Sequence, residues 1–413
     1  MTGLFFVVSL FIGSLTYNLF RPIYQHSGLS VVSFVSGWLV GELALHHIVL
    51  QLFTVFLFAL VGAIHGLLGA LGLVLCVASW LSMGWFYLRS GAAKLQMQQA
   101  LLMALGSHYE TQIQDSQRAH FPIEPDFGKI KDPRHNIHPS VEVLKNVSFG
   151  QHGQKLDIYR ARRELINRPV LLQIHGGAWT EKMGSKNEQA VPLMSHMAMR
   201  DWICVSIDYR LSPTATFPEH IIDCKEGLAW VKTHIHKYGG NPDFIIVTGG
   251  SAGGHLCSLL ALTANDPVFQ PGFEDIDTQV QGAVPFYGVY DLTDEHKLQK
   301  NTAQRKLFET SVLKIPLVGN SNQYKAGSPL FRVNSAAPPF LIIHGSKDSL
   351  VPVEEARMFA AKLKGVSEQP VAFAEISDAQ HAFDMFPSLR SEHVKQGVER
   401  FLAYLYSQYL TKN

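Results

Sequence analysis

The chain divides into two parts by its pattern of apolar and polar positions. It has 35 Lys and Arg and 34 Asp and Glu residues, but only two of these, Arg21 and Glu42, lie within residues 1–88. A nearly uncharged stretch of this length is typical of helices that face lipid, because an unpaired charge in hydrocarbon is costly. We therefore expect residues 1–90 to form a transmembrane helical region in front of a water-exposed domain.

Three apolar runs within this region are candidates for membrane spans. The run 3–20 is near the lower limit for crossing a hydrocarbon core of about 30 Å at about 1.5 Å per residue. The run 29–50 is long enough, whereas 51–88 exceeds one span and contains glycines at which it can break. The pattern predicts three or four spans. Arg89 and Lys94 follow the last span, and their positive charge places the following domain in the cytoplasm.

Four ionisable side chains lie inside the apolar runs: Glu42, His46, His47 and His65. Ionisable groups at membrane depth are candidates for function. Glu42 and His46 are four residues apart and therefore share a helix face. A metal or proton site would need further ligands that the sequence does not supply, so packing between helices is the favoured role and no metal is assigned.

Residues 91–140 form an amphipathic connecting segment. Residues 94–105 mix Leu and Met with Gln, which favours an amphipathic helix that lies on the membrane or packs under the following domain. Four prolines between residues 122 and 139 then interrupt the pattern.

Strand-like and helix-like stretches alternate from residue 141 to the last residue, 413. This alternation is typical of a mostly parallel sheet with helices on both faces. The predicted strands are eight apolar runs, at 141–149, 156–159, 170–174, 203–207, 244–248, 282–286, 340–343 and 371–376. We expect one large α/β domain over residues 141–413.

A glycine-flanked serine follows the fifth predicted strand. Gly249, Ser251 and Gly253 fit the pattern G-x-S-x-G, in which small residues let a strand turn sharply into a helix and expose the serine hydroxyl. A phosphate-binding loop is the alternative interpretation. No Lys-Ser or Lys-Thr pair follows the glycines, which weakens that alternative.

Glycines also follow the third predicted strand, in the stretch His175-Gly-Gly-Ala-Trp. An acyl-transfer enzyme needs backbone N–H groups aimed at the developing oxyanion, and glycine lets the backbone approach closely. Gly176 and Gly177 are the candidate donors, with Ala252 as a third. His175 precedes the donors, so we interpret it as a structural residue that braces this loop.

A nucleophilic serine needs a base, and the base needs an orienting carboxylate. Asp348 follows the seventh predicted strand, and His381 follows the eighth. The order Ser251, Asp348, His381 is that of α/β-hydrolases. Asp378 and Asp384 are rival candidates for the acid, but they are too close in sequence to His381 to come from a separate strand end.

Six ordered stretches together resemble the hormone-sensitive-lipase-like esterases, the α/β-hydrolase fold-3 group. They are His-Gly-Gly-Ala-Trp (175–179), Asp-Tyr-Arg-Leu-Ser-Pro (208–213), Gly-Gly-Ser-Ala-Gly-Gly (249–254), Tyr-Gly-Val-Tyr-Asp (287–291), His-Gly-Ser-Lys-Asp (344–348) and His-Ala-Phe (381–383). More narrowly, the chain is similar to bacterial membrane-anchored carboxylesterases of this group. The resemblance implies an α/β-hydrolase fold with Ser251, Asp348 and His381 as catalytic residues and Gly176, Gly177 and Ala252 as the oxyanion hole.

Two positions depart from the pattern of this group. Ala178 stands where the third glycine of H-G-G-G is usual, and Gly250 stands where an acidic residue commonly precedes the nucleophile. The H-G-G-x-W form is also similar to kynurenine formamidases and prenylcysteine methylesterases.

The sequence therefore predicts a membrane-anchored serine ester hydrolase of the carboxylesterase or lipase type, acting through an acyl-enzyme. Its expected partners are a small ester with an apolar acyl group and the lipid bilayer; no cofactor is implied, and the oligomeric state is not predicted. The net charge of +1 gives no reason to expect nucleic acid binding. The alternatives are a formamidase-like or prenylcysteine-methylesterase-like hydrolase on the same triad, and a non-catalytic membrane receptor or scaffold.

Three further expectations concern the surroundings of this site. Arg210 ties neighbouring loops together through Glu219 and Asp223. The stretch 291–338 caps an acyl pocket. Because the triad and all predicted strands follow the connector, a truncated chain that starts near Phe121 is expected to fold and to hydrolyse soluble esters.

Overall fold

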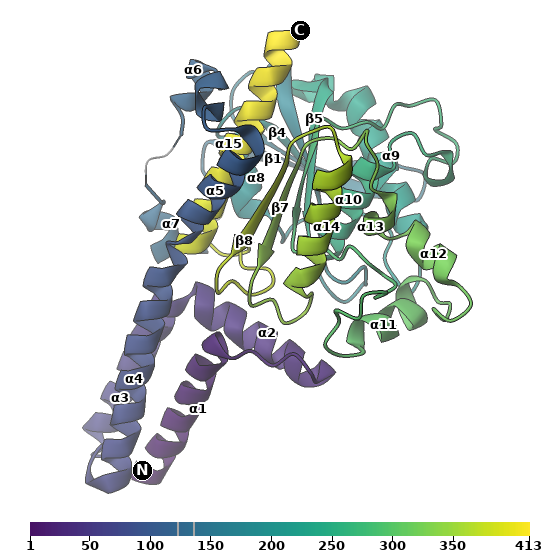
Figure 1. Cartoon of the computed structure of the whole chain (residues 1–413). Coiled ribbons are helices and arrows are strands. Elements are labelled where there is room, and N and C mark those ends of the chain that lie inside the picture. The colour runs from purple at the N-terminus through teal and green to yellow at the C-terminus, as the bar shows by residue number, and fades with distance from the viewer. Residues whose placement is uncertain (122–123, 135–136) are drawn as a thin grey trace.

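The computed structural model of the chain describes residues 1–121, 124–134 and 137–413. Its centre is an eight-stranded sheet in the order β1-β2-β4-β3-β5-β6-β7-β8, with helices on both faces (Figure 1). β1, β2 and β4 pair antiparallel, and all other neighbours are parallel. The strands are β1 (Val141–Ser148), β2 (Lys155–Ala161), β3 (Arg168–Ile174), β4 (Ile203–Ile207), β5 (Gly240–Gly250), β6 (Gly282–Phe286), β7 (Phe340–Gly345) and β8 (Val371–Ile376). This is the α/β-hydrolase arrangement that the alternation of strands and helices predicts.

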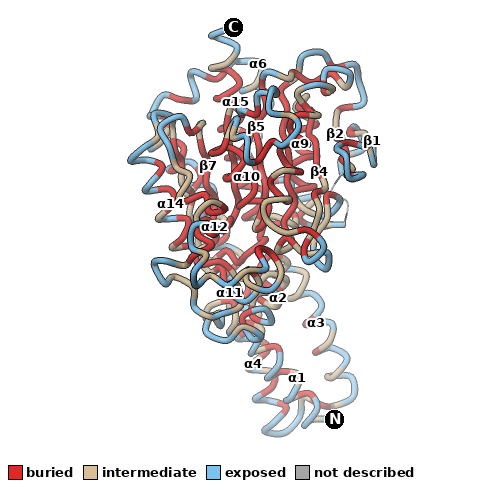
Figure 2. Tube along the Cα trace, turned by 90° about the vertical axis from the view of Figure 1, so that its right-hand side faces the viewer, coloured by how far each residue is buried: buried red, intermediate tan, exposed pale blue. Residues whose placement is uncertain are grey.

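Successive residues of the central strands face opposite sides of the sheet, and each side has its own apolar core. Figure 2 shows that the strands are buried along most of their length. In β3, Val170 and Leu172 face one core and Leu171 faces the other. The helices of the first core are α9 (Glu219–His234), α10 (Ala252–Leu262) and α14 (Val353–Val366), and those of the second are α5 (Ala93–Leu105), α8 (Val191–Ala198) and α15 (Leu389–Lys412). Such a central sheet is apolar on both faces because helices cover both.

Shorter helices lie in the connections. They are α6 (Asp115–Arg118), α7 (Phe127–Lys131), α11 (Ala303–Leu307), α12 (Ser321–Ala326) and α13 (Pro329–Arg332), with single turns of other helix types at Tyr109–Gln112, Ile235–Tyr238, Pro267–Phe269 and Phe308–Val312. All four cysteines, Cys76, Cys204, Cys224 and Cys257, are free and buried.

α5 packs in the core around the sheet, although residues 106–140 separate it from β1. We call the sheet together with α5 to α15 the hydrolase unit. Met97 and Leu101 are buried against α15 and β8. The Gln96 side chain hydrogen-bonds Ser377 and accepts the Ser377 N–H at 3.1 Å. A truncated chain that starts at Phe121 lacks this helix, so the packing of α5 argues against the expectation that such a chain folds.

Four helices precede α5, and three of them form a bundle beside the hydrolase unit (Figure 1). The four are α1 (Thr2–Phe20), α2 (Ser27–Glu42), α3 (Ala44–Leu60) and α4 (Gly66–Ser90). By length and apolar composition, α1 and the helical column from Gly66 to Leu105 are long enough to cross a membrane. The pair α2 and α3 is a third candidate only if it is counted as one broken span.

The prediction that one continuous helical span covers residues 29–50 is wrong. The chain bends by 90° at Leu43, between α2 and α3. α2 therefore does not continue the bundle but lies under the carboxyl ends of β7 and β8 (Figure 1). The described residues contain two candidate spans, or three if α2 and α3 count as one broken span, so the upper value agrees with three of the expected three or four spans. α3, with 17 residues, is at the lower limit for a hydrocarbon core.

Candidate active site

Ser251 lies in the sharp turn between β5 and α10. Its φ of +59° is in a region that side chains other than glycine rarely adopt. The flanking glycines have no space for a side chain: a Cβ at Gly249 would lie 2.4 Å from the Gly253 carbonyl oxygen, and a Cβ at Gly253 would lie 2.1 Å from that of Ile174. This is the geometry of a nucleophile elbow, which the pattern G-x-S-x-G predicts.

Asp348 and His381 form a direct pair at the ends of β7 and β8. His381 Nδ1 is 2.6 Å from Asp348 Oδ2, and both side chains are buried. The other carboxylate oxygen accepts backbone N–H groups from Leu350 at 2.9 Å and Val351 at 2.8 Å. These contacts fix the imidazole through its Nδ1.

The environment of Asp348 keeps its carboxylate ionised. Burial by itself would raise the pKa of Asp348, but His381 and His344 hold that pKa well below its usual range. His344 Nε2 lies 3.2 Å from Asp348 Oδ2 and 3.1 Å from the Val351 carbonyl oxygen. His344, at the end of β7, therefore also supports the acid.

The two rival acids have other partners. Asp378 forms an ion pair with Arg89 at 3.1 Å, and Asp384 accepts a hydrogen bond from the Tyr287 hydroxyl. Burial raises the pKa of Asp384, although the Tyr287 hydroxyl opposes that rise. Neither carboxylate hydrogen-bonds the His381 ring, so the geometry favours Asp348.

Three residues that the sequence analysis did not select also hold the histidine. Gln380 Oε1 accepts the N–H groups of His381 at 3.0 Å and Ser349 at 2.7 Å, which joins the base loop to the acid loop. The Tyr287 ring lies 4.6 Å from the His381 ring, and the Phe34 ring approaches it edge-on at 5.8 Å. Tyr287 follows β6 directly, and this position at a strand end could have identified it as a residue of the site. Phe34 comes from α2, and no sequence spacing connects it to His381.

Tyr287 also explains the departure at Gly250. A Cβ at Gly250 would lie 2.8 Å from the Tyr287 hydroxyl oxygen. The tyrosine therefore occupies the space that an acidic side chain before the nucleophile would need. Glycine at position 250 leaves the space that the Tyr287 side chain fills.

The loop after β3 requires a correction to the predicted oxyanion hole. The Gly176 N–H donates to Gln189 Oε1 at 2.5 Å, so it is not free to bind an oxyanion. Among the residues that the structure describes, the N–H groups of Gly177, Ala178 and Ala252 have no acceptor. Gly177 has a φ of +104°, and a Cβ there would overlap the Met183 carbonyl group. The donor set that the geometry favours is thus shifted by one residue.

His175 braces this loop, in agreement with the interpretation from sequence. Its Nδ1 is 2.7 Å from the Gly176 carbonyl oxygen, and its ring stacks on Tyr209 at 4.5 Å. Tyr209 in turn donates to the His175 carbonyl oxygen at 3.0 Å. Burial lowers the pKa of His175 to about 4, so the ring is neutral near pH 7.

The expected ion pairs of Arg210 are confirmed. Arg210 contacts Asp223 through several hydrogen bonds of 2.8 to 3.1 Å and Glu219 at 2.8 Å. In the stretch 291–338, Phe308 packs against Trp179 at 5.8 Å and joins the apolar core. This stretch therefore covers the loop that contains the oxyanion donors.

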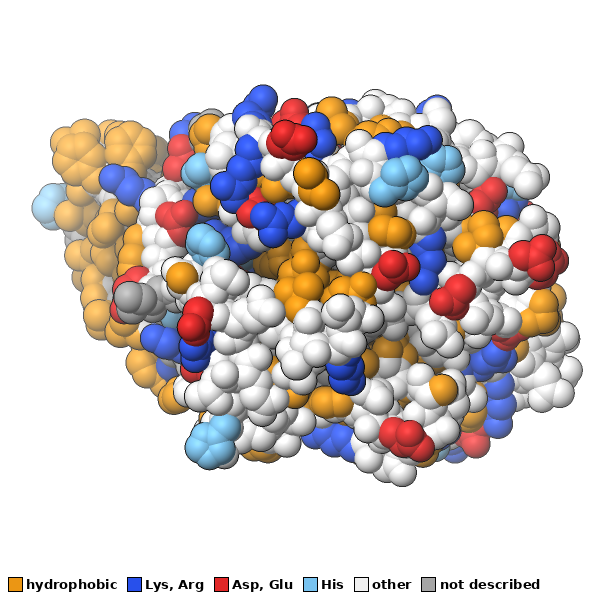
Figure 3. Space-filling view, turned by 90° about the horizontal axis from the view of Figure 1, so that it is seen from above, with side chains coloured by type: hydrophobic (Ala, Val, Ile, Leu, Met, Phe, Trp, Pro, Cys, Tyr) orange, Lys and Arg blue, Asp and Glu red, His pale blue; other side chains and the backbone are white. Residues whose placement is uncertain are grey.

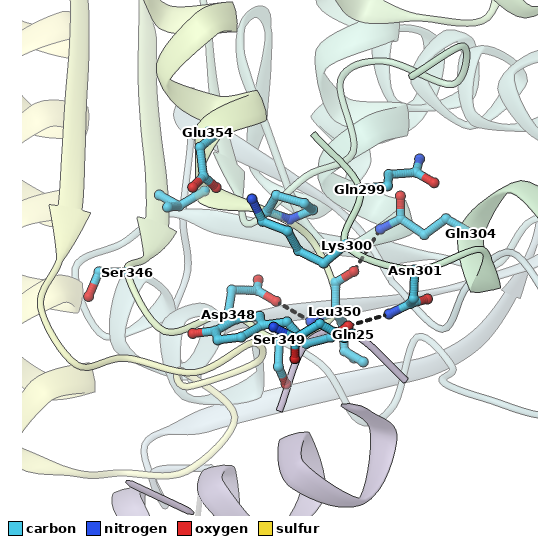
Figure 4. Close-up of a pocket in the computed structure, with 13 residues that line it drawn as sticks. Gln25, Gln299, Lys300, Asn301, Gln304, Ser346, Asp348, Ser349, Leu350 and Glu354 are labelled. Atoms are coloured by element: carbon cyan, nitrogen blue, oxygen red, sulfur yellow. Dashed lines mark hydrogen bonds between the residues drawn. The ribbon is translucent and has the colours of Figure 1, made fainter. Parts of the chain in front are cut away.

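The N-terminal region also lines a cavity of about 410 Å³ beside the acid (Figure 4). Its walls come from the segment between α1 and α2, from residues 299–304 and from the loop 346–354. The Asn301 amide closes one side by donating to the Tyr24 carbonyl oxygen at 2.7 Å.

Glu42 has a packing role, as expected. It accepts from Ser388 at 2.6 Å and forms a fully buried ion pair with Arg390. His46 Nε2 lies 3.0 Å from the Lys131 carbonyl oxygen. Within residues 1–121, 124–134 and 137–413, no group of three His, Cys, Asp or Glu side chains is arranged to hold a metal ion.

Comparison with known proteins agrees with this geometry. The family model described as BD-FAE matches residues 156–363, about half of the chain. The chain is 54% identical over 269 residues to the probable carboxylic ester hydrolase LipM of Mycobacterium tuberculosis, which covers 63% of this chain and 61% of LipM. It is 46% identical over 268 residues to the esterase LipQ of the same organism, covering 64% and 62% of the two chains.

Among solved structures, the butyrate-bound esterase Est2 of Thermogutta terrifontis is similar with a TM-score of 0.52 and 25% identity. The match covers 66% of this chain and 94% of the esterase. The chain thus spans less than two thirds of the length of the curated relatives it matches, but nearly all of a solved esterase.

Proposed function

The chain belongs to the BD-FAE family of α/β-hydrolases, and on this premise we propose that it is a membrane-anchored serine hydrolase of carboxylic esters. The observation that carries the proposal is the buried Asp348–His381 pair at 2.6 Å, at the same sheet edge as a serine in a strained elbow. Esterase relatives at 54% and 46% identity support the same reaction class. The substrate is a small-molecule ester with an apolar acyl group.

In the proposed mechanism, Ser251 Oγ attacks the ester carbonyl carbon while His381 Nε2 takes the hydroxyl proton. Asp348 fixes the imidazole through Nδ1 and stabilises its protonated form. The N–H groups of Gly177, Ala178 and Ala252 bind the oxyanion of the tetrahedral intermediate, where one such donor contributes about 3 to 4 kcal/mol.

Collapse of this intermediate breaks the bond to the alcohol, and His381 gives its proton to the leaving oxygen. The acyl group remains as an ester on Ser251. A water molecule then attacks the acyl carbon and gives a proton to His381. The second collapse releases the carboxylic acid and returns the proton to Ser251.

We further propose that α1 and α4 cross a membrane and that the hydrolase domain lies on the cytoplasmic side. The apolar length of both helices supports the anchor. Arg89, in the last turn of α4, and Lys94, in the first turn of α5, support the orientation through the positive-inside rule. Protease protection in sealed vesicles tests the orientation. Protease should cleave the hydrolase domain in inside-out vesicles, where the cytoplasmic side faces outward, and should not cleave it in right-side-out vesicles.

The test of the chemistry is covalent labelling with a fluorophosphonate, combined with hydrolysis of p-nitrophenyl esters. The wild type should be labelled and Ser251→Ala should not. Ser251→Ala and His381→Ala should each lower kcat by roughly 10⁴-fold or more with an unchanged circular dichroism spectrum. Retention of more than a tenth of the activity would contradict the assignment.

Asp348→Asn and Asp378→Asn form a matched pair for the acid. Asp348→Asn should lower kcat severely, whereas Asp378→Asn should have little effect because Asp378 is paired with Arg89. N-formylkynurenine and a prenylcysteine methyl ester, tested beside the p-nitrophenyl series, distinguish the alternative hydrolases. A wild type that is neither labelled nor active would favour the non-catalytic receptor or scaffold.

A further inference from the structure

α2 contacts the catalytic edge of the hydrolase unit along its whole length. Near its start, the Ser30 carbonyl oxygen accepts from Ser349 Oγ, in the acid loop, at 3.3 Å. In its middle, Phe34 meets the His381 ring edge-on. At its end, Glu42 accepts from Ser388 and pairs with Arg390. One wall of the active site is therefore a helix that the apolar N-terminal region supplies (Figure 1).

A row of aromatic rings runs along this helix away from the triad. Phe34 and Trp38 are four residues apart on one face of α2 and stack at 5.8 Å. Trp38 stacks on Phe386, from the loop after β8, at 4.8 Å. We call Phe34, Trp38 and Phe386 the aromatic strip. Phe34 and Trp38 are only partly buried, so an apolar chain can lie against them.

α2 also exposes apolar side chains in its first half. Leu29, Val31, Val32 and Val35 are between 40% and 63% exposed, and residues 27–41 contain no charged side chain. α3, which begins directly after the bend at Leu43, also exposes apolar side chains such as Val49 and Phe53. An exposed apolar patch on a helix that joins candidate membrane helices along the chain fits the bilayer as its occupant.

The 90° bend gives the orientation of this surface. If α1, α3 and α4 run along the membrane normal, α2 runs along the membrane surface. The catalytic edge of the sheet then faces the bilayer, with α2 between them. Figure 3 shows the opposite, amino-terminal end of the sheet, where Lys, Arg, Asp and Glu side chains are spread over the surface.

We propose that α2 lies in the bilayer surface and that the aromatic strip receives the apolar chain of an ester that enters the active site from the lipid phase. This inference rests on the proposed ester hydrolysis and adds the substrate class: an ester with a long apolar chain, dissolved in the membrane. Phe34 and Trp38 are specificity residues in this scheme, since Ser251, His381 and the loop amides suffice for short esters.

The first experiment compares short and long esters on the full chain in phosphatidylcholine vesicles. Trp38→Ala should lower kcat/KM for p-nitrophenyl palmitate about tenfold or more, and for p-nitrophenyl acetate less than about threefold. Trp85→Ala is the matched control, because Trp85 is an exposed tryptophan of α4 that stacks on Phe20 outside the strip. It should change neither value.

The outcomes separate this inference from the proposed function. Equal losses for both esters in Trp38→Ala, with a wild type that fluorophosphonate labels, would overturn the inference alone. A wild type without labelling or hydrolysis would overturn the proposed function and the inference with it.

A second experiment does not depend on the stability of Trp38→Ala. Val32→Cys and Val268→Cys are each labelled with the fluorophore NBD; both side chains are exposed, but Val268 lies in the hydrolase unit away from α2. Nitroxide-labelled lipid should quench the fluorophore at position 32 and leave that at position 268 unchanged. If nitroxide-labelled lipid quenches the fluorophore at neither position, α2 lies in water and the inference is overturned.

Discussion

α2 and α5 both precede the sheet, and both pack on the domain that begins with β1, but they do so in different ways. α5 buries Met97 and Leu101 in an apolar core shared with α15 and β8. α2 touches the unit through separate polar and aromatic contacts beside the triad, such as those of Phe34 and Glu42. The comparison teaches that α5 belongs to the folding unit and that α2 belongs to the active site.

The largest expected difference between the two helices is in folding after truncation. A chain truncated to start at Phe121 lacks α5 and should not fold, because the apolar surface of α15 and β8 would be exposed. A chain truncated to start at Ala92 retains α5 and should show native circular dichroism and hydrolyse acetate esters. Urea unfolding curves of both truncated chains measure this.

A cooperative unfolding transition for the chain that starts at Phe121 would break the comparison, since α5 would then be dispensable for folding. If the chain that starts at Ala92 does not fold, α1 to α4 are also part of the folding unit, which would contradict the comparison.

The next effect concerns the buried pair between Glu42 and Arg390. Arg390→Met leaves a buried, uncompensated carboxylate and should destabilise the protein by about 3–5 kcal/mol. The double variant Glu42→Leu/Arg390→Met should recover most of this loss, because two apolar side chains pack where two charges were. Thermal unfolding in detergent, followed by fluorescence, ranks the stabilities of the wild type, Arg390→Met and the double variant. A double variant no more stable than Arg390→Met would show that the ion pair itself stabilises the junction.

Leu101→Ala tests the core role of α5 by a single side chain. Leu101 is fully buried, and its truncation should lower the free energy of unfolding by about 2–4 kcal/mol while kcat of the folded fraction stays unchanged. Leu95→Ala is the control on the same helix, because Leu95 is 60% exposed. A similar loss for both variants would mean that α5 does not bury Leu101 in solution.

The last effect is a dependence of stability on pH, at a site that touches neither helix. Glu355 of α14 accepts the N–H groups of Tyr290 at 3.0 Å and Asp291 at 3.3 Å, and burial raises its pKa to about 8. The folded state therefore binds a proton more tightly than the unfolded state. The resulting stabilisation is complete below pH 4.5 and is lost as the pH rises through 8.

Glu355→Gln keeps an oxygen acceptor and removes the titration. Between pH 5.5 and 8.5, the wild type should lose more thermal stability than this variant does. Parallel slopes for the two proteins would show that Glu355 does not titrate in this range.

Much of the hydrolase unit follows from local sequence pattern. The predicted ranges 203–207, 282–286 and 371–376 match β4, β6 and β8 residue for residue, because each is a short apolar run between polar turns. Ser251, Asp348 and His381 each follow a strand, so the parallel sheet brings them to one edge. The prediction of Gly176 as a donor is wrong because its N–H is bound to Gln189, which lies in a loop without a regular pattern.

By itself, the sequence determined the parallel sheet, the elbow at Ser251 and the acid–base pair, since these depend on glycine backbone freedom and on apolar periodicity. Only the tertiary structure decided what surrounds them. The 90° bend at Leu43 brings Phe34 to His381, and the fold of the β3 loop brings Gln189 to Gly176. Contacts between residues hundreds of positions apart depend on how whole elements pack, and no local spacing records that packing.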